Sequence, residues 1–207
     1  MKQWIKNNIV ILRTALIWGV VITLILQITV LSHQCYGIRH EVLRLHILAN
    51  SDSEADQSVK IAVRDALLKS SAPLLQGANS RQELLAIAEQ SMTQLQTVAQ
   101  QTVKAAGYDY PVTCHLADTY FETRTYDKVT LPAGTYTAVQ VVLGEGKGKN
   151  WWCVMFPSLC LPAATQPVEK VLTPGQTELV EGGSRYKVKF KVVEWFQSVW
   201  HSCRSWF

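Results

Sequence analysis

The first 40 residues contain no acidic side chain, and the only Lys or Arg residues among the first 32 are Lys2, Lys6 and Arg13. Thr14–Leu31 carries no charge at all. A helix exposed to water needs a polar face, so this absence excludes an ordinary solvent-exposed helix. At about 1.5 Å per residue, a helix over Ile9–Leu31 is long enough to cross a hydrocarbon layer of about 30 Å.

The basic flank favours a topology in which the N-terminus stays in the cytoplasm and the rest of the chain is exported. Residues 1–32 are therefore predicted to be a signal peptide or a signal-anchor helix. The apolar region is long for a cleaved signal peptide, and Val30 and Ser32 match poorly the small residues expected before a cut at His33. A retained anchor is favoured, with cleavage as the alternative.

The exported part has almost no net charge. Removing residues 1–32 takes away three basic and no acidic side chains, which leaves 17 Lys and Arg against 16 Asp and Glu. This balance gives no basic footprint for nucleic acid, so no nucleic-acid partner is expected. The remaining length suits one domain with a core of its own.

Motifs for metal, nucleotide and hydrolytic chemistry are also missing. No two His residues stand four apart on a predicted helix, and the glycines of Gly144–Asn150 have the wrong spacing for a phosphate-binding loop. We therefore expect neither a metal nor a small-molecule cofactor. A Cys-dependent extracytoplasmic hydrolase using Cys153 or Cys160 is the alternative function, although no nucleophile signature surrounds either residue.

The chain has five Cys residues, so in an oxidising compartment an even number can pair and at least one is left over. Cys153 and Cys160 are the natural disulfide candidates because a bridge between them closes a short loop around Pro157. Two buried thiols are an equally good interpretation of the pair.

The exported part begins with the patterns of a strand and two helices. Val42–Ala49 alternates Leu and Ile with Arg44 and His46, which predicts a strand with one apolar face. A capping box, either Ser53 with Asp56 or Ser51 with Glu54, starts a helix that Pro73 is expected to end. A second helix is predicted over Ser80–Ala106, with Gly107 as its C-terminal cap.

Strand patterns dominate the chain after Gly107. The predicted strands are Val112–Leu116, Tyr120–Thr125, Thr135–Leu143, Trp151–Phe156 and Arg185–Val193, with an irregular stretch over Ser158–Gly183. An aromatic-rich helix is predicted from Glu194. The fold class is α+β: residues 33–193 form one domain in which two helices pack on a mostly antiparallel or mixed sheet, and residues 194–207 form the C-terminal helix.

Polar side chains cluster where the first strand ends and the first helix begins. They are candidates for a partner-binding surface, and a solvated, well-capped helix face is the alternative. The pair Trp151 and Trp152 also has two interpretations, as core or as exposed anchors for a partner. The cluster comprises Arg44, His46, Asn50, Asp52, Asp56, Gln57, Lys60 and Arg64.

Two blocks of sequence resemble the stage II sporulation protein R family. The first is Leu43–Ser53 followed by Asp56-Gln57, Lys60 and Val63–Asp65; the second is Leu131–Tyr136 followed by Gly144–Cys160. Ser158 departs from the family, in which a second proline is usual at this position.

The resemblance implies a signalling ligand rather than an enzyme. Such a protein is made in the forespore, exported across the forespore membrane and active in the intermembrane space. Its expected partner is a membrane-embedded aspartic protease of the mother cell, which processes the precursor of the sigma-E factor.

Overall fold

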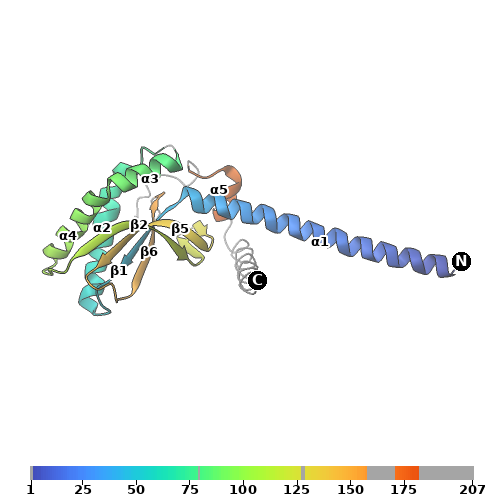
Figure 1. Ribbon diagram of the computed structural model, residues 1–207, viewed down its shortest axis with the longest axis horizontal. Helices are drawn as coiled ribbons and strands as arrows, with labels where there is room; N and C mark the ends of the chain where they lie inside the picture. The colour runs from blue at the N-terminus through green and yellow to red at the C-terminus, as the bar shows by residue number, and fades with distance from the viewer. Residues whose placement is uncertain (1, 79, 127–128, 158–170, 182–207) are drawn as a thin grey trace.

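Figure 1 shows the computed structural model of the chain, which describes every residue except 1, 79, 127–128, 158–170 and 182–207. The predicted strand Arg185–Val193 and the predicted helix from Glu194 therefore lie outside the described residues. The described elements, in chain order, are α1 (Lys2–Glu41), β1 (Leu43–Leu48), α2 (Glu54–Leu75), α3 (Arg81–Gln90), α4 (Met92–Ala105), β2 (Val112–Phe121), β3 (Arg124–Tyr126), β4 (Val129–Leu131), β5 (Gly134–Leu143), β6 (Asn150–Phe156) and α5 (Pro174–Glu181).

Helix α1 projects far from the rest of the molecule (Figure 1). Among the described residues it contains the one helical stretch, Asn8–Glu41, that is long and apolar enough to cross a membrane. The helix does not stop near Leu31 but continues to Glu41, and only Val42 separates it from β1. Its last turns are part of the domain core, because Cys35 and Ile38 have no exposed surface.

The domain is built on a mixed four-stranded sheet with the order β2-β5-β1-β6. Strands β1 and β5 run parallel, and the other two pairings are antiparallel. Strand β2 is continuous where two strands were predicted, because it pairs with β5 along its whole length, from Val112 opposite Leu143 to Phe121 opposite Gly134. Strands β3 and β4 form a separate two-stranded sheet.

The two faces of the main sheet carry different cores. Helices α2, α3 and α4 cover one face, where Leu45, Ile47 and Val141 are completely buried. The base of α1, helix α5 and strand β4 pack on the other face around Tyr136 and Val154. The α+β class and the mixed sheet packed by helices are thus as expected from the sequence.

Three further expectations about the extent of helices were wrong. The helix predicted over Ser80–Ala106 is two helices, and at the break the Ser91 hydroxyl donates to the carbonyl of Ile87 (2.7 Å), as serine often does when it competes with the helical backbone. Pro73 lies inside α2, which continues to the buried Leu75. Helix α5 lies in the stretch predicted to be irregular.

Candidate functional site

Most of the predicted polar cluster lies at the end of the sheet that is farthest from the long apolar part of α1. Strand β1 starts directly after α1 and leads away from it to the turn before α2, and the loop between β5 and β6 meets that turn (Figure 1). We call this region, Asn50–Lys60 together with Gly144–Asn150, the distal end.

Asp56 organises the turn between β1 and α2. Ser53 caps the helix by accepting a hydrogen bond from the Asp56 N–H (3.2 Å), so of the two predicted capping boxes the one at Ser53 forms. The hydroxyl of Ser51 and the side-chain amide of Asn50 both donate to Asp56 Oδ2, at 2.5 Å and 2.9 Å. These bonds, above all the one from Ser51, lower the pKa of the Asp56 carboxyl.

Backbone contacts join this turn to the β5–β6 loop. The N–H of Glu145 donates to Asn50 Oδ1 (3.0 Å), and the N–H of Lys149 donates to Asp52 Oδ1 (2.6 Å). A Cβ atom at Gly144, whose φ is +56°, would collide with the Asn50 side chain, and one at Gly148 would collide with the carbonyl of Ser51. The glycines are thus explained by close approach and a positive φ, and no bound phosphate is needed.

Lys60 is buried and joins α2 to the β5–β6 loop, so it does not present a charge at the surface. It is 4% exposed, and its ammonium donates to Gln57 Oε1 (2.5 Å) and to the carbonyl of Lys149 (2.9 Å). Gln57 in turn donates to the carbonyl of Ser51 (2.9 Å). Burial lowers the pKa of Lys60, and the nearby Asp52 carboxylate opposes that shift.

Arg44 is also inaccessible. It has no exposed surface, its Nε donates to the carbonyl of Cys153 (2.9 Å) and its Nη2 donates to the Tyr126 hydroxyl (2.7 Å). The guanidinium lies 4.1 Å from the centre of the Phe121 ring and 4.9 Å from that of Tyr136. Burial lowers the pKa of Arg44. The prediction of one apolar face on β1 is confirmed, because Leu45 and Ile47 pack in the core under the helices; the opposite face with Arg44 is buried as well, since this central strand is covered on both sides.

The remaining predicted residues form two aromatic contacts. His46, which is 5% exposed, stacks on Trp152 with ring centres 3.8 Å apart, and burial lowers the pKa of its imidazole. On the other face of the sheet, Arg64 lies 4.6 Å from the centre of the Trp151 ring and pairs with Asp65 (2.7 Å). Both Trp side chains are partly buried, so they are packed and still reachable from one side.

Cys153 is completely buried and disulfide-bonded. Cys35 and Cys114 are free thiols, and Cys160 and Cys203 lie outside the described residues. Cys160 stays our proposed partner. Burial raises the pKa of the Cys114 thiol to about 12. Among the residues that the structure describes, no three His, Cys, Asp or Glu side chains are grouped so that they could hold a metal ion.

Sequence reasoning missed the exposed charges of the distal end and the aromatic residues around Arg44. Lys147 and Glu145 form an ion pair (2.7 Å) whose side chains are 75% and 68% exposed. Their position in a glycine-rich loop was the available signal. Phe121, Tyr126 and Tyr136 come from three strands, so no local pattern could have linked them to Arg44.

Comparison with known proteins gives one consistent result. The model of the family described as stage II sporulation protein R matches residues 39–166. The stage II sporulation protein R of Bacillus subtilis (strain 168) is 30% identical over 191 residues, which cover 81% of this chain and 85% of that protein. No solved structure matches the chain.

Proposed function

The chain belongs to the stage II sporulation protein R family, and on that premise we propose that it is a signalling ligand exported from the forespore. Its target is the membrane-embedded aspartic protease of the mother cell that processes the sigma-E precursor. The family match, which includes nearly the whole described domain, carries this proposal and already gives the chain a role in sporulation.

The placement of α1 supports export with a fixed orientation. An apolar helix with basic residues on its N-terminal side holds that side in the cytoplasm and directs the domain across the membrane. Because α1 continues into the core without a linker, the distal end is held away from the membrane that α1 crosses. In the space between two membranes, this end faces the partner membrane.

The distal end is built like a presented surface. Asn50, Asp56 and Lys60 use their polar groups internally to fix the loop, so they act as a scaffold. The exposed pair Glu145 and Lys147 extends from that scaffold into solvent. Rigid presentation of a few side chains lowers the entropy cost of binding.

Cysteine chemistry gives the hydrolase alternative little support. Cys153 is occupied by a disulfide, and a thiol such as Cys114, with a pKa of about 12, is protonated at neutral pH and is a weak nucleophile. No described feature favours catalysis, so we propose a ligand and not an enzyme.

The test is precursor processing in cells that express the full chain, the protease and the sigma-E precursor. Lys147→Glu should reduce processing at least tenfold, because it reverses a charge on the proposed contact surface without disturbing the core. Lys69→Glu is the matched control: it makes the same charge change at an exposed position of α2 and should leave processing unchanged.

Two results would contradict the proposal at different levels. Normal processing by a folded Lys147→Glu variant would place the contact outside the distal end. Failure of the wild-type chain to raise processing above the level without it would remove the protease as the target.

A further inference from the structure

Strand β2 is an edge strand, since β5 is its one neighbour in the described sheet. The first half of its outer edge is closed by two side chains of α4. Gln100 Oε1 accepts from the N–H of Val112 (2.9 Å), and Gln96 Oε1 accepts from the N–H of Cys114 (3.3 Å). Gln100 also donates to the carbonyl of Tyr110 (3.1 Å).

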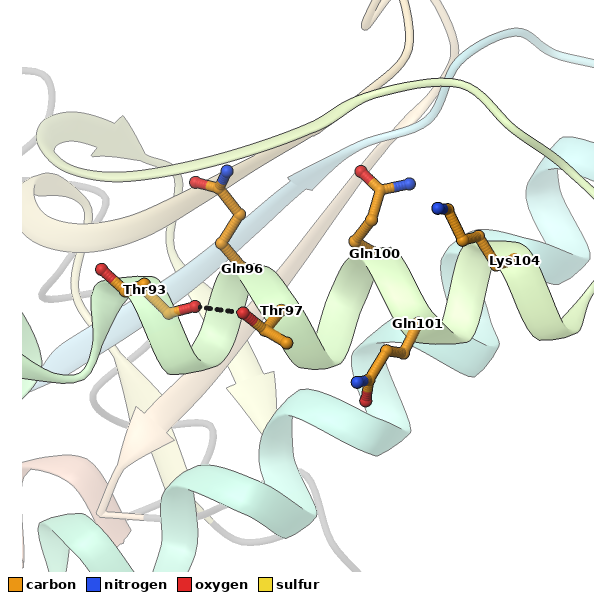
Figure 2. Close-up of a pocket in the computed structure, with 6 residues that line it drawn as sticks. All are labelled: Thr93, Gln96, Thr97, Gln100, Gln101 and Lys104. Carbon is orange, nitrogen blue, oxygen red and sulfur yellow. Dashed lines mark hydrogen bonds between the residues drawn. The ribbon is translucent and has the colours of Figure 1, made fainter.

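The two glutamines act as a ladder because their spacing matches that of the strand. Four residues of helix rise about 6 Å and two residues of strand about 6.8 Å, so side chains at i and i+4 meet alternate strand residues. Figure 2 shows Gln96 and Gln100 extending from the same side of α4. Both side chains line a hollow of about 340 Å³. Four residues earlier stands Met92, whose thioether cannot continue the pattern.

In the part of the chain that the structure describes, the second half of the edge has no such closure. By the alternation that Val112 and Cys114 establish, the N–H groups of Leu116, Asp118 and Tyr120 also point outward. None of the described residues forms a hydrogen bond with these three groups. Asp118 and Tyr120 are exposed, and Leu116 is half-buried.

Natural proteins usually protect an edge strand with Lys, Pro, a bulge or a covering element. Strand β2 contains neither Lys nor Pro, and its pairing with β5 has no bulge. The two glutamines of α4 cover the edge at Val112 and Cys114, and the uncovered part begins at Leu116. An unprotected row of alternating donors and acceptors is a template for an added strand.

We propose that the open edge, Leu116–Tyr120, binds an extended segment of the protein that this ligand activates, which joins the sheet as a further strand. The inference rests on the proposed function for the identity of that protein. Because Asp118 pairs with Thr137 near the start of β5, the open edge lies toward the base of α1 and not at the distal end, so the bound segment must extend beyond the distal contact. A second copy of this chain is a poor occupant, because self-pairing in register about Asp118 would place two carboxylates side by side. A segment with a basic or neutral residue opposite Asp118 fits instead.

Amide hydrogen exchange on the full chain in detergent, with and without the protease, tests the inference directly. The N–H groups of Leu116, Asp118 and Tyr120 should exchange fast in the free chain and at least tenfold more slowly in the complex. Those of Val112 and Cys114 should be slow in both states. Binding with unchanged exchange at the three open positions would overturn the inference, whereas absence of any binding would contradict the proposed function.

A matched pair of variants separates the contribution of the backbone N–H of Asp118 to binding from that of its side chain. Asp118→Pro removes an outward N–H that β5 does not use, so an edge strand tolerates it. Asp118→Ala keeps that N–H, and both variants lose the carboxylate and the hydrogen bond that it accepts from the Thr137 hydroxyl (3.0 Å). We expect precursor processing to fall at least tenfold for the first variant and to stay near wild type for the second. Equal processing by both folded variants would overturn the inference.

A second pair keeps the test valid if Asp118→Pro fails to fold. Met92→Gln extends the ladder by one amide that can close the edge at Leu116, and Met92→Leu keeps the apolar contact. We expect reduced processing for the glutamine variant alone. Unchanged processing in both variants would count against a partner segment. So would slow amide exchange at the open positions of the free chain, if that chain associates with itself.

Discussion

At the scale of single residues, most of the polar side chains that were predicted to form a binding surface are buried or form hydrogen bonds within the domain. Arg44 and Lys60 are buried, and Asn50 and Asp56 form hydrogen bonds within the turn. Asp52 and Arg64 keep more exposure. Variants of the buried group should therefore lose function by losing the fold, which makes them unsuitable for mapping a contact.

Asp56→Asn tests this internal role. The substitution removes the charge from an acceptor of bonds from Asn50 and Ser51 and leaves one amide N–H group facing donors, so unfolding should cost about 1–3 kcal/mol less. Urea denaturation at pH 7 measures the difference.

The pH dependence of Asp56→Asn gives an independent check. The folded-state pKa of Asp56 is lowered, so its carboxylate contributes stability above the ordinary carboxyl pKa, and that contribution is lost as the pH falls through the folded-state value. The difference in the free energy of unfolding between wild type and Asp56→Asn should become smaller as the pH falls. A gap that widened at low pH would contradict the assigned hydrogen bonds.

At the scale of elements, local patterns predicted well what local physics decides. The cap at Ser53, the start of a helix at Ser80 and the glycine at Gly107, with its φ of +86°, depend on residue types a few positions apart. The β1–β5 pairing and the burial of Arg44 depend on contacts between distant segments, and no periodicity encodes them. The sequence therefore located the distal end but misjudged which of its side chains are accessible.

The β5–β6 loop makes a prediction at this scale. Gly148→Ala places a methyl group against the carbonyl of Ser51, so the loop and the β1–α2 turn must separate, at a cost of about 1–3 kcal/mol. Thermal denaturation followed by circular dichroism measures the loss. Gly77→Ala is the control, because a Cβ there meets no atom within 4 Å and should change the melting temperature little. Equal shifts in both variants would mean that the close approach has no energetic role.

At the scale of the whole molecule, α1 combines a stretch that is apolar enough for a membrane with a base that belongs to the domain core. Its apolar stretch suits a membrane, while Cys35 and Ile38 lie in the domain core and Arg39 donates to the carbonyl of Ala133 (3.3 Å). Arg81, at the start of α3, donates to the carbonyl of His40. These two hydrogen bonds hold the base of the helix to the domain from two sides, so we expect α1 and the domain to tilt together.

This dual membership predicts how truncation acts. A chain that begins at residue 33 keeps Cys35, Ile38 and Arg39, and should unfold cooperatively with a melting temperature close to that of the full chain in detergent. A chain that begins at residue 42 loses the burial of Ile38, which alone is about 1.5–3 kcal/mol, and both clamps. Because domains are stable by only about 5–15 kcal/mol, the shorter chain should melt far lower or lose its near-ultraviolet signal. Similar melting temperatures for the two chains would show that the base of α1 is an attachment to the domain and not a part of its core.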